Sequence, residues 1–460
     1  MQRAFDIASM NVTVIGAARS GLAAARLLHQ KGGRVFLTEF SPAEAFAESA
    51  RILREEGIPH EFGGHSARVF AADMVVVSPG VPSDAPVVVE AERRGLPVIS
   101  EIEVGTMFLD GPIIAVTGTN GKTTTTTLCG EICDAAGRNT LVAGNIGRAF
   151  TDALRAHAGA IDIAVLEVSS FQLDTCLTFH PSTAVITTIT PDHLNRYHGD
   201  FQEYVASKQR IFMNQCAQDH LIYNHDDPVV SGAIKTAAAE LFPVSAILRL
   251  GRGGWRENGS LMIDAGFGKE LLARVDDLQV YGRHNYMNVL MAGLAARLEG
   301  IGIEVIRQAC MEFRGVEHRL EFVCEVDGVR WINDSKATNV DSVVIALQSY
   351  RQPVVLIAGG RDKGASYEPL FDLIRERVRA MVLIGEAAEK MEREFAPHTR
   401  VTRARDMSEA VNIARMAAQP GDVAMLSPAC ASFDMFENFE QRGQIFKECV
   451  HTFCREPLVA

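Results

Sequence analysis

The strongest constraint in this sequence is a short stretch, 113–124, in which an apolar run leads directly into a glycine-bounded loop. The run Ile-Ile-Ala-Val has the composition of a buried strand, and Gly118-Thr-Asn-Gly-Lys-Thr123 follows it before a helical pattern begins. Glycines let backbone N–H groups turn toward an anion, and the dipole of the following helix favours negative charge. Lys122 and the hydroxyl of Thr123 suit phosphate and Mg²⁺. The stretch therefore predicts a strand, a phosphate-binding loop and a helix, in that order.

This loop is shorter than the full phosphate-loop pattern, because Val116 occupies the place of its first glycine. The alternative is a tight glycine turn between a buried strand and a helix, with no ligand. Since the Gly-Lys-Thr sequence directly follows an apolar strand, the context favours phosphate binding.

Length, charge and cysteine usage limit the class of protein. A chain of 460 residues is too long for one hydrophobic core, so several domains are expected. The net charge of −12 argues against nucleic acid or an anionic membrane as a partner, and local basic groups must then hold any anionic substrate. The nine cysteines include no Cys-x-x-Cys pair, which is typical of reduced thiols in a cytoplasmic protein. Residues 1–10 do not resemble a signal peptide, and no apolar run is long enough to span a membrane.

Strand and turn signals alternate through the N-terminal part of the chain. Asn11–Ile15 is predicted to be a strand, and it leads into a turn in which Ala18 replaces the middle glycine of a dinucleotide-binding motif. The next strand ends at Thr38-Glu39, where such a fold places a ribose-binding acid. A bound nucleotide and an α/β unit without a ligand are equally compatible with this segment.

Two further strands complete this part of the chain. One stops abruptly at Ser78-Pro79-Gly80, and a strand end of this kind is where open α/β sheets bind ligands. The other covers 96–99, and Asp110-Gly111-Pro112 then interrupts the pattern. Residues 1–110 are therefore predicted to form one small, doubly wound domain.

Three strands of the next segment end in polar residues. The first leads to Asn145, and the second is an almost continuous apolar strand that ends at Glu167, where a phosphate-loop protein needs a Mg²⁺ ligand. The alternative for Glu167 is a carboxylate paired with a neighbouring Lys or Arg. The third strand enters Asp192-His193. A lone histidine is more often structural, but the adjacent aspartate and the two other strand ends favour a functional role.

Lys208 shares the apolar stripe of a predicted helix with Phe201 and Val205. A buried ammonium group needs a partner or a shifted pKa. Lys208 is therefore either a lysine that snorkels to solvent or a functional lysine that points toward the phosphate site. The spacing by itself favours the snorkelling interpretation.

The rest of the chain contains another group of polar strand ends. Residues 221–280 are β-rich and irregular, and Asn285 and Asn288 then share a face near the start of a long helix, where they either cap the helix or bind a base or phosphate. Residues 315–319 are predicted to be a linker. Three strands beyond it end in the loops 333–339, 359–364 and 427–433, which we expect to gather on one edge of a parallel sheet.

Together these segments resemble the Mur ligase family, the ATP-dependent ligases of peptidoglycan precursor synthesis. The features shared across the family are the phosphate loop, Glu167-Val-Ser-Ser-Phe-Gln, Asp192-His193, Gly282-Arg-His-Asn-x-x-Asn288 and Glu317-His-Arg319. The D-glutamate-adding branch is indicated by Asn333-Asp-Ser-Lys-Ala-Thr-Asn339, Gly359-Gly-Arg-Asp-Lys-Gly364 and the run from Ser427 to Gly443. The resemblance covers nearly the whole chain.

The resemblance implies three α/β domains and a role for each. Residues 1–110 would form a Rossmann-like domain for the uridine diphosphate substrate, 111–314 a phosphate-loop ATPase-like domain with a mostly parallel sheet, and 315–460 a Rossmann-like domain for the amino acid. ATP is expected at Gly118, Thr119, Asn120, Gly121, Lys122, Thr123, Thr124, Asn285, Asn288, Arg319 and Asp334. UDP-N-acetylmuramoyl-L-alanine is expected at Ser20, Glu39, Ser78, Pro79, Gly80 and Asn145. D-glutamate is expected at Lys336, Thr338, Lys363, Ser432 and Phe439.

The resemblance also implies the chemistry. Lys122, Glu167, His193 and Lys208 are the expected catalytic residues, and two Mg²⁺ ions are expected at Thr123, Glu167, His193 and Lys208. Lys208 would be carbamylated, because a carbamate anion can ligate a metal, and this reverses the snorkelling interpretation. The substrate carboxylate would attack the γ-phosphate of ATP, and the amine of D-glutamate would attack the resulting acyl phosphate. We expect a cytoplasmic monomer with no nucleic-acid or membrane partner.

Three other functions remain open. The first is a sibling Mur or folylpolyglutamate-type amide ligase that adds another amino acid, and D-glutamate dependence separates it from the main hypothesis. The second is a nicotinamide-dependent oxidoreductase that uses the Gly16 turn, which would bind NAD. The third is a non-catalytic nucleotide-binding module, in which Lys122→Ala would cost no activity.

Overall fold

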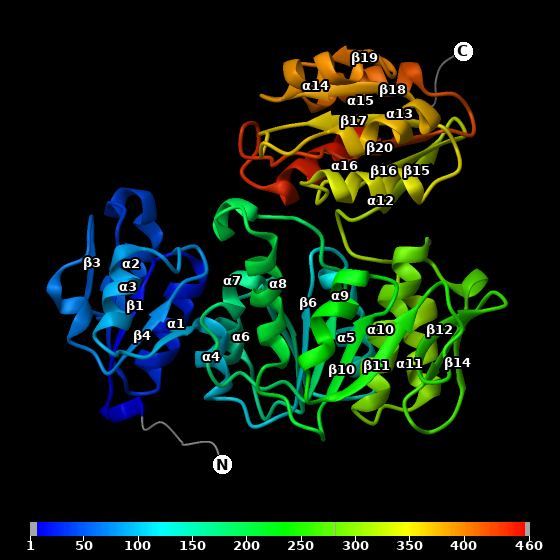
Figure 1. Cartoon of the computed structure of the whole chain (residues 1–460). Coiled ribbons are helices and arrows are strands. Elements are labelled where there is room, and N and C mark those ends of the chain that lie inside the picture. The colour runs from blue at the N-terminus through cyan, green and yellow to red at the C-terminus, as the bar shows by residue number, and fades with distance from the viewer. Residues whose placement is uncertain (1–6, 281, 456–460) are drawn as a thin grey trace. The chain divides into compact units, whose positions relative to one another are not determined.

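The computed structural model describes residues 7–280 and 282–455, apart from the side chains at 453–455. Residues 1–6, Tyr281 and the thiol of Cys454 lie outside the described part. Residues up to Leu278 form one compact unit with Asn285–Phe313, and Gln279–His284 form a second with the residues from Arg314 on. The three sheets are mostly parallel and carry helices, so the predicted α/β class is confirmed (Figure 1). None of the helices in the described part is long and apolar enough to cross a membrane.

The first unit begins with a five-stranded parallel sheet, drawn in blue in Figure 1. Its elements are β1 (Asn11–Ile15), α1 (Arg19–Gln30), β2 (Arg34–Glu39), α2 (Ala47–Glu55), β3 (His60–Phe62), β4 (Met74–Val77), α3 (Pro86–Arg93), β5 (Val98–Ser100) and α4 (Glu101–Thr106). The strand order is β3-β2-β1-β4-β5. β1 is central because both of its faces are apolar: Val12 and Val14 belong to the core beside α1, whereas Ile15 belongs to the core beside α3. β2 extends to Glu39, so both candidate ribose contacts lie within the strand.

The same unit contains a nine-stranded sheet. Its elements are β6 (Ile113–Thr117), α5 (Lys122–Ala135), β7 (Thr140–Gly144), α6 (Phe150–Ala156), β8 (Ile163–Glu167), α7 (Ser170–Leu173), β9 (Thr183–Ile186), α8 (Phe201–Gln209), β10 (His220–Asn224), α9 (Pro228–Ala233), β11 (Glu240–Ser245), β12 (Gly253–Glu257), β13 (Ser260–Asp264), β14 (Glu270–Arg274), α10 (Arg283–Leu298) and α11 (Ile303–Glu312). The strand order is β14-β13-β12-β11-β10-β9-β6-β8-β7. The strand that precedes the phosphate loop therefore lies between the strands that lead to Glu167 and to Asp192-His193.

The second unit contains a six-stranded sheet. Its elements are β15 (Glu321–Val326), β16 (Val329–Asn333), α12 (Val340–Gln348), β17 (Val354–Gly359), α13 (Phe371–Arg377), β18 (Val378–Ile384), α14 (Ala388–Phe395), β19 (Arg400–Arg403), α15 (Met407–Ala417), β20 (Val423–Leu426) and α16 (Phe439–Arg455). The strand order is β15-β16-β20-β17-β18-β19. β20 pairs in parallel with β16 on one side and with β17 on the other. The three polar loops therefore leave neighbouring strands at the same edge, as predicted.

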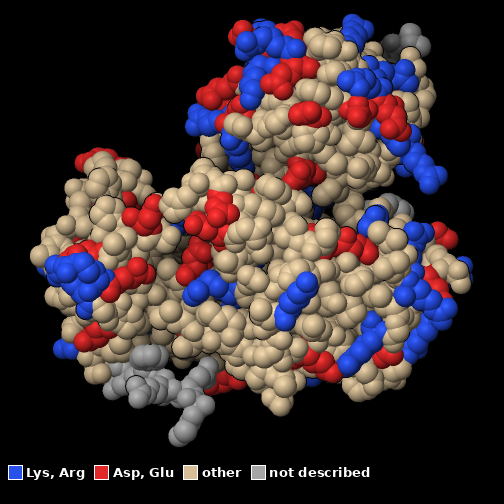
Figure 2. Space-filling model, in the orientation of Figure 1, with Lys and Arg blue, Asp and Glu red and all other residues tan. Residues whose placement is uncertain are grey.

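Charges of both signs are mixed on the surface. On the face shown in Figure 2, Lys and Arg side chains lie among Asp and Glu side chains. Some form exposed ion pairs within one helix, such as Arg51 with Glu48 and Glu55. Exposed pairs of this kind contribute little stability, so the apolar cores and the buried polar contacts decide the fold.

Helix α4 joins the two sheets of the first unit through buried carboxylates. Glu103 accepts hydrogen bonds from the backbone N–H groups of Leu177, Thr178 and Phe179 at 2.7–3.1 Å. Glu101 is fully buried and accepts from both the N–H and the hydroxyl of Thr151 at 2.6 Å. Burial raises the pKa of Glu101 to about 7, although the contacts with Thr151 favour the charged form.

The raised pKa makes the stability of this unit depend on pH. Between the ordinary pKa of 4.5 and the folded value of about 7, the folded chain keeps a proton that the unfolded chain has lost. The contribution of Glu101 to the free energy of unfolding is therefore complete below about pH 4.5 and is lost as the pH rises through about 7. The free energy of unfolding falls by about 3 kcal/mol over this range. Glu101→Gln should remove this pH dependence.

The measurement is chemical unfolding of the first unit from pH 5 to pH 8. We expect a smaller fall in stability for Glu101→Gln than for the wild type, whatever the absolute stability of the variant. Glu92→Gln changes an exposed glutamate on α3 and is the matched control. Parallel pH profiles for Glu101→Gln and the wild type would contradict the assignment.

Candidate active site

The phosphate loop needs its two glycines for space as well as for conformation. Gly118 has a φ of +147°, and a Cβ there would lie 1.9 Å from Thr187 Oγ1. Gly121 has a φ of +88°, and its Cβ would lie 2.6 Å from Asn288 Oδ1. Thr187, which follows β9, also holds the loop by donating to Asn120 O at 2.5 Å. A side chain at either glycine would therefore displace the residues that fix the loop.

Two lysines converge on one backbone oxygen of this loop. Lys122 Nζ lies 2.9 Å from Gly118 O and 3.0 Å from Thr119 O, and Lys208 Nζ lies 2.9 Å from the same Gly118 O. Lys208 is 1% exposed, so it does not snorkel to solvent. Burial lowers the pKa of Lys208 well below its ordinary value, and the charge of Lys122 lowers it further. Burial and the charge of Lys122 thus both favour the neutral form of the Lys208 amine beside the phosphate loop.

Glu167 is the last residue of β8 and lies next to β6 in the sheet. It pairs in register with Val116, two residues before Gly118, and its side chain is 2% exposed. Asn145 Nδ2 donates to Glu167 Oε1 at 2.8 Å. The structure therefore brings together two predicted site residues, one in a loop and one at a strand end, that are 22 residues apart in the sequence.

The loop that carries Asp192 and His193 is tied directly to the phosphate loop. Thr119 Oγ1 accepts from Thr190 N at 3.0 Å and lies 3.1 Å from Thr190 O. His193 has a φ of +54°, its N–H donates to Asp192 Oδ1 at 2.9 Å, and its ring packs edge-on against Phe171 at 5.2 Å. The imidazole is 45% exposed, so a substrate can reach it.

The start of α10 meets the start of α5. Asn288 Oδ1 accepts from Thr125 Oγ1 at 3.3 Å, and Asn288 Nδ2 donates to Asn285 Oδ1 at 3.4 Å. Asn288 is 6% exposed and packs against Gly121. Both asparagines therefore lie beside the phosphate loop, as a nucleotide-binding role requires.

The first sheet contributes a second group of loops. A Cβ at Gly16 would lie 2.7 Å from Ser78 Cβ, so the glycine turn and the loop after β4 are in close contact. Glu39 Oε2 accepts from Ala17 N at 2.9 Å, whereas the Thr38 hydroxyl lies 2.9 Å from Glu61 Oε1. Both candidates therefore contact the glycine turn, Glu39 through its side chain and Thr38 through its carbonyl oxygen, which accepts from Gly16 N at 2.9 Å.

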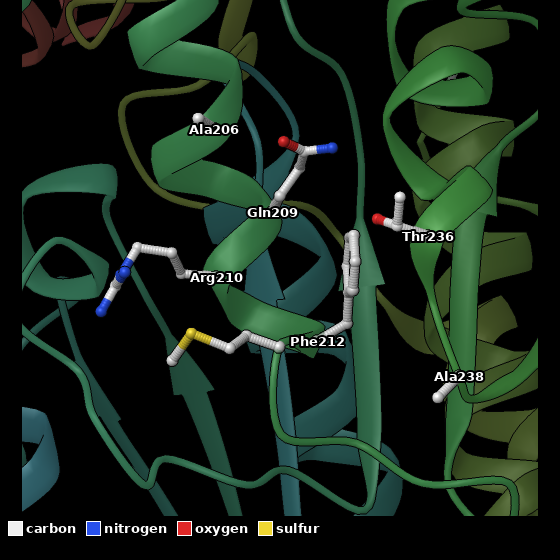
Figure 3. A pocket seen from close by; sticks show the side chains of 7 residues that line it. Ala206, Gln209, Arg210, Phe212, Thr236 and Ala238 are labelled. Carbon is white, nitrogen blue, oxygen red and sulfur yellow. The ribbon is translucent and has the colours of Figure 1, made fainter.

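One surface pocket of the first unit lies apart from these loops. Its volume is about 290 Å³, and it is lined by residues of α8, of the short helix after α8 and of the segment before β11 (Figure 3). The lining residues are Ala206, Gln209, Arg210, Phe212, Met213, Thr236 and Ala238. None of the predicted site residues is among them, so the candidate site is a cluster of strand-end loops and not this pocket.

In the second unit, Asp334 lies buried where β16 ends. Ser427 Oγ donates to Asp334 Oδ2 at 2.8 Å, and Leu320 N donates to Asp334 Oδ1 at 3.2 Å. Burial raises the pKa of Asp334 to about 7, and the charge of the neighbouring Arg319 opposes this shift. The predicted pair Arg319 and Asp334 therefore lies together at the edge where β16 and β20 meet.

The predicted amino-acid residues lie in the loops of the same edge. Lys363 Nζ donates to Thr338 Oγ1 at 3.3 Å, and Lys336 Nζ lies 5.3 Å from the centroid of the Phe439 ring. Ser432 is 2% exposed in the loop after β20. A backbone bridge between Arg361 and Ala431 joins this loop to the loop after β17. Two ammonium groups, two hydroxyls (that of Ser432 buried) and an aromatic ring thus lie at one sheet edge.

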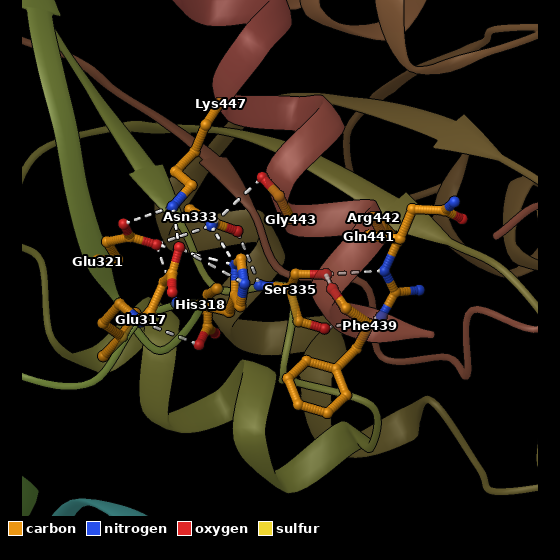
Figure 4. Close-up of polar contacts among 12 residues, drawn as sticks. Glu317, His318, Glu321, Asn333, Ser335, Phe439, Gln441, Arg442, Gly443 and Lys447 are labelled. Atoms are coloured by element: carbon orange, nitrogen blue, oxygen red, sulfur yellow. Dashed lines mark hydrogen bonds and ion pairs between the residues drawn. The ribbon is translucent and has the colours of Figure 1, made fainter. Parts of the chain in front are cut away.

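No role was predicted for Arg442 from the sequence, although it lies within the run from Ser427 to Gly443 that indicated the D-glutamate branch. Arg442 is fully buried. Its Nε donates to Ser335 Oγ at 3.0 Å and its Nη2 to Ser335 O at 2.7 Å (Figure 4). Its Nη1 donates to Cys430 O at 3.1 Å. Burial lowers the pKa of Arg442 to about 10. The sequence contained one indication of a role for Arg442: it lies three residues after Phe439, and this spacing places both side chains on one face of α16.

A second set of contacts fastens α16 to the same loops. Asn333 Nδ2 donates to Glu321 Oε2 at 2.9 Å and lies 2.9 Å from His318 Nδ1, while Lys447 pairs with Glu321 Oε1 at 3.0 Å (Figure 4). A Cβ at Gly443 would lie 2.2 Å from His318 Nδ1, so the helix can approach only with glycine at this position. The start of α16, which carries Phe439, is therefore held rigidly beside β16.

Three family models match consecutive parts of the chain. They are described as Mur ligase MurD-like, N-terminal domain (residues 10–100), Mur ligase middle domain (residues 116–296) and Mur ligase, glutamate ligase domain (residues 318–430).

Similar proteins match along nearly the whole chain. The UDP-N-acetylmuramoylalanine--D-glutamate ligase of Salinibacter ruber is 48% identical over 97% of this chain and 99% of its own length. The protein of the same name from Chloroherpeton thalassium is 45% identical over 97% of this chain and 98% of its own length.

Solved structures share the fold at low identity. MurF from Acinetobacter baumannii is 18% identical with a TM-score of 0.61, over 95% of this chain and 93% of that chain. A pseudomurein peptide ligase type C from Methanothermus fervidus is 19% identical with a TM-score of 0.60, over 96% of this chain and 100% of that chain. With family models over most of its length and relatives above 40% identity, this chain belongs to the Mur ligase family.

Proposed function

We propose that this protein is an ATP-dependent ligase that joins D-glutamate to UDP-N-acetylmuramoyl-L-alanine through an acyl phosphate, in peptidoglycan precursor synthesis. The observation that carries the proposal is the similarity to D-glutamate ligases from end to end, at 42–48% identity. The arrangement of the site residues supports it independently: a phosphate loop lies among polar strand ends in the first unit, and basic and hydroxyl groups gather at one sheet edge in the second.

The three predicted domains would divide the work. Residues 1–110 would hold the uridine diphosphate end of the substrate through Ser20, Glu39, Ser78, Pro79 and Gly80, with Asn145 from the following domain. Residues 111–314 would bind ATP, and 315–460 would bind D-glutamate and complete the nucleotide contacts through Arg319 and Asp334. Described cysteines are free thiols, which agrees with the predicted cytoplasmic location. The monomeric state stays a prediction.

ATP would be held by the loop from Gly118 to Thr124 and by Asn285 and Asn288. The first backbone N–H groups of a helix have no acceptor within it, so the start of α5 suits an anion. Lys122 now donates to two carbonyl oxygens of its own loop, and the same ammonium group can instead donate to the outer phosphates. The substrate carboxylate would then attack the γ-phosphate in line, with Lys122 offsetting the negative charge.

The residues present fit two Mg²⁺ ions. Thr123, Glu167 and a carbamylated Lys208 would offer oxygen atoms, which Mg²⁺ prefers, and His193 would complete the set. The supporting observation is the position of Glu167: this carboxylate ends β8, beside the strand that leads into the phosphate loop, where a phosphate-loop protein needs a Mg²⁺ ligand. Bound Mg²⁺ would neutralise the phosphate oxygens and orient the transferring group.

Lys208 is suited to carbamylation for a physical reason. Its amine shares the Gly118 oxygen with the Lys122 ammonium group, and burial favours the neutral form. A neutral amine adds to CO₂ by forming an N–C bond and releasing one proton, which converts the side chain to a carbamate anion. The modification would replace repulsion from Lys122 with attraction and would supply metal-binding oxygens.

The second step needs the acidic amino acid in a fixed position. Lys336 and Lys363 would pair with the carboxylates of D-glutamate, and Thr338 and Ser432 would add hydrogen bonds. Phe439 would pack against its methylene groups. The amine would attack the acyl carbon, and phosphate would leave as the amide forms. Since positioning accounts for much of the rate in such a reaction, the rigid start of α16 would matter for turnover.

The first prediction concerns the amino acid. With ATP, Mg²⁺ and UDP-N-acetylmuramoyl-L-alanine, phosphate release should require D-glutamate, and L-alanine, diaminopimelate and D-alanyl-D-alanine should give little product. The measurement is phosphate release with mass detection of the ligated nucleotide. Phosphate release that does not depend on D-glutamate, or that follows another amino acid, would favour a sibling amide ligase instead.

The second prediction concerns Lys208→Met. Ligation should be lost, because the variant has no amine that can carry the carbamate and supply metal-binding oxygens. Bicarbonate labelled with ¹³C should give a carbamate signal in the wild type and none in the variant. Lys235→Met, an exposed lysine in the same unit, is the control and should change neither quantity. A carbamate signal that persists in Lys208→Met would contradict the assignment.

The third prediction concerns D-glutamate recognition. Lys363→Met should raise the KM for D-glutamate by about tenfold or more, since a charge-assisted hydrogen bond to a carboxylate contributes roughly 1.5–3 kcal/mol. The KM for ATP should change less than about twofold, because Lys363 belongs to the amino-acid group. Lys363→Arg should restore part of the affinity. Equal changes in both KM values would show that Lys363 acts on the fold of the unit.

A further inference from the structure

Arg196 links the two groups of loops in the first unit. It lies in the short 3₁₀ helix η4 (Leu194–Tyr197), directly after Asp192 and His193. Its Nη2 donates to Val81 O at 2.5 Å and to Pro79 O at 3.2 Å, and its Nη1 lies 3.5 Å from Gly80 O. Arg196 belongs to the part of the unit that contains the nine-stranded sheet. Its guanidinium group thus holds three successive carbonyl groups of the loop that follows β4 in the other sheet.

The same guanidinium group also lies over an aromatic ring of α7. Its carbon lies 4.8 Å from the centroid of the Phe171 ring, and this ring packs against the imidazole of His193 at 5.2 Å. Arg196 Nε is buried and has no acceptor among the described residues. The three carbonyls and the aromatic ring, rather than a carboxylate partner, therefore set the position of Arg196.

Two further contacts cross between the same parts of the unit. His198 Nε2 lies 3.4 Å from Asp84 Oδ2, beyond the loop that Arg196 holds. In the opposite direction, Arg19 Nη1 donates to Gly147 O at 2.6 Å, two residues after Asn145. The loops assigned to the uridine end and the loops assigned to the reacting end are thus joined on two sides.

We propose that Arg196 is a positioning residue that sets the relative position of the 78–81 loop and the 192–193 loop. The inference rests on the proposed function, in which one substrate must touch both loops: its nucleotide at Ser78–Gly80 and its carboxylate near His193. A substrate whose nucleotide is bound at one loop places its carboxylate correctly at the other only if the two loops keep a constant separation. Small errors in this placement lower the reaction rate strongly. Arginine suits this task because its planar group offers five N–H donors in a rigid arrangement, which lysine lacks.

The chain offers a matched control in Arg210. This arginine also donates to backbone carbonyls, those of Leu173 at 2.8 Å and of Cys176, but all of its partners lie beside the nine-stranded sheet. Arg210→Met therefore removes the same type of contact without releasing the 78–81 loop. Loss of general stability should appear in both variants, whereas loss of loop position should appear only in Arg196→Met.

The first test is hydrogen exchange of the protein without ligands. Amides of residues 78–85 should exchange at least about fivefold faster in Arg196→Met than in the wild type, because the loop opens more often once its clamp is removed. The same amides should exchange at the wild-type rate in Arg210→Met. Unchanged exchange at 78–85 in Arg196→Met would overturn the proposal whatever reaction the enzyme catalyses.

The second test is steady-state kinetics with UDP-N-acetylmuramoyl-L-alanine, D-glutamate and ATP. Arg196→Met should raise the KM for the uridine substrate about tenfold and leave the KM for ATP within about twofold, and Arg196→Lys should lie between Arg196→Met and the wild type. Equal effects on both KM values would show a merely structural role. If the wild type shows no D-glutamate-dependent reaction, the proposed function fails, and the exchange experiment still decides the role of Arg196.

Discussion

The carbonyl oxygen of Gly118 is the acceptor on which the site in the first unit depends. It receives hydrogen bonds from Lys122 and Lys208, both at 2.9 Å. Two ammonium groups that share one oxygen in a buried setting repel each other, so burial and the charge of Lys122 both lower the pKa of Lys208. The same carbonyl can face both lysines only because Gly118 adopts a positive φ and leaves room for Thr187. Gly118 thus places its carbonyl oxygen within reach of a lysine 90 residues further along the chain.

Parallel pairing explains why this arrangement contains so many candidate residues. The carboxyl ends of parallel strands lie at one edge, and each unit of the chain uses that edge. In the first unit, β6 lies between β8 and β9, which brings the phosphate loop beside Glu167 and beside the Asp192-His193 loop. In the second unit, β20 lies between β16 and β17, which brings Asp334 beside Ser427. The sites differ in chemistry, but the same sheet geometry assembles both.

Two arginines, the buried Arg442 and the partly buried Arg196, hold these loops by their backbones. Arg442 donates to carbonyls or hydroxyls of Ser335 and Cys430, and Arg196 donates to the carbonyls of residues 79–81. Contacts to carbonyl groups fix a loop while leaving its side chains available to a ligand. The helix α16 adds rigidity in the second unit, because Gly443 lets it lie directly against His318. Arg442, Arg196 and Gly443 have no direct chemical role, but they fix the positions of the residues that would have one.

The sequence by itself determined the local features of this protein and the family to which it belongs. Apolar runs and the polar residues after them predicted the strands and their ends, and the spacing of Gly118, Gly121 and Lys122 predicted the phosphate loop, because these signals depend on residues close together in the chain. Only the tertiary structure decided the strand order, the burial of Lys208, the contact of the Glu39 side chain with the glycine turn, and the contacts of Arg196 and Arg442. Periodicity specifies which face of an element is apolar but not which distant element covers it. The spacing of Lys208 therefore favoured a solvated lysine, and only the packing of α8 against the phosphate loop excluded that interpretation.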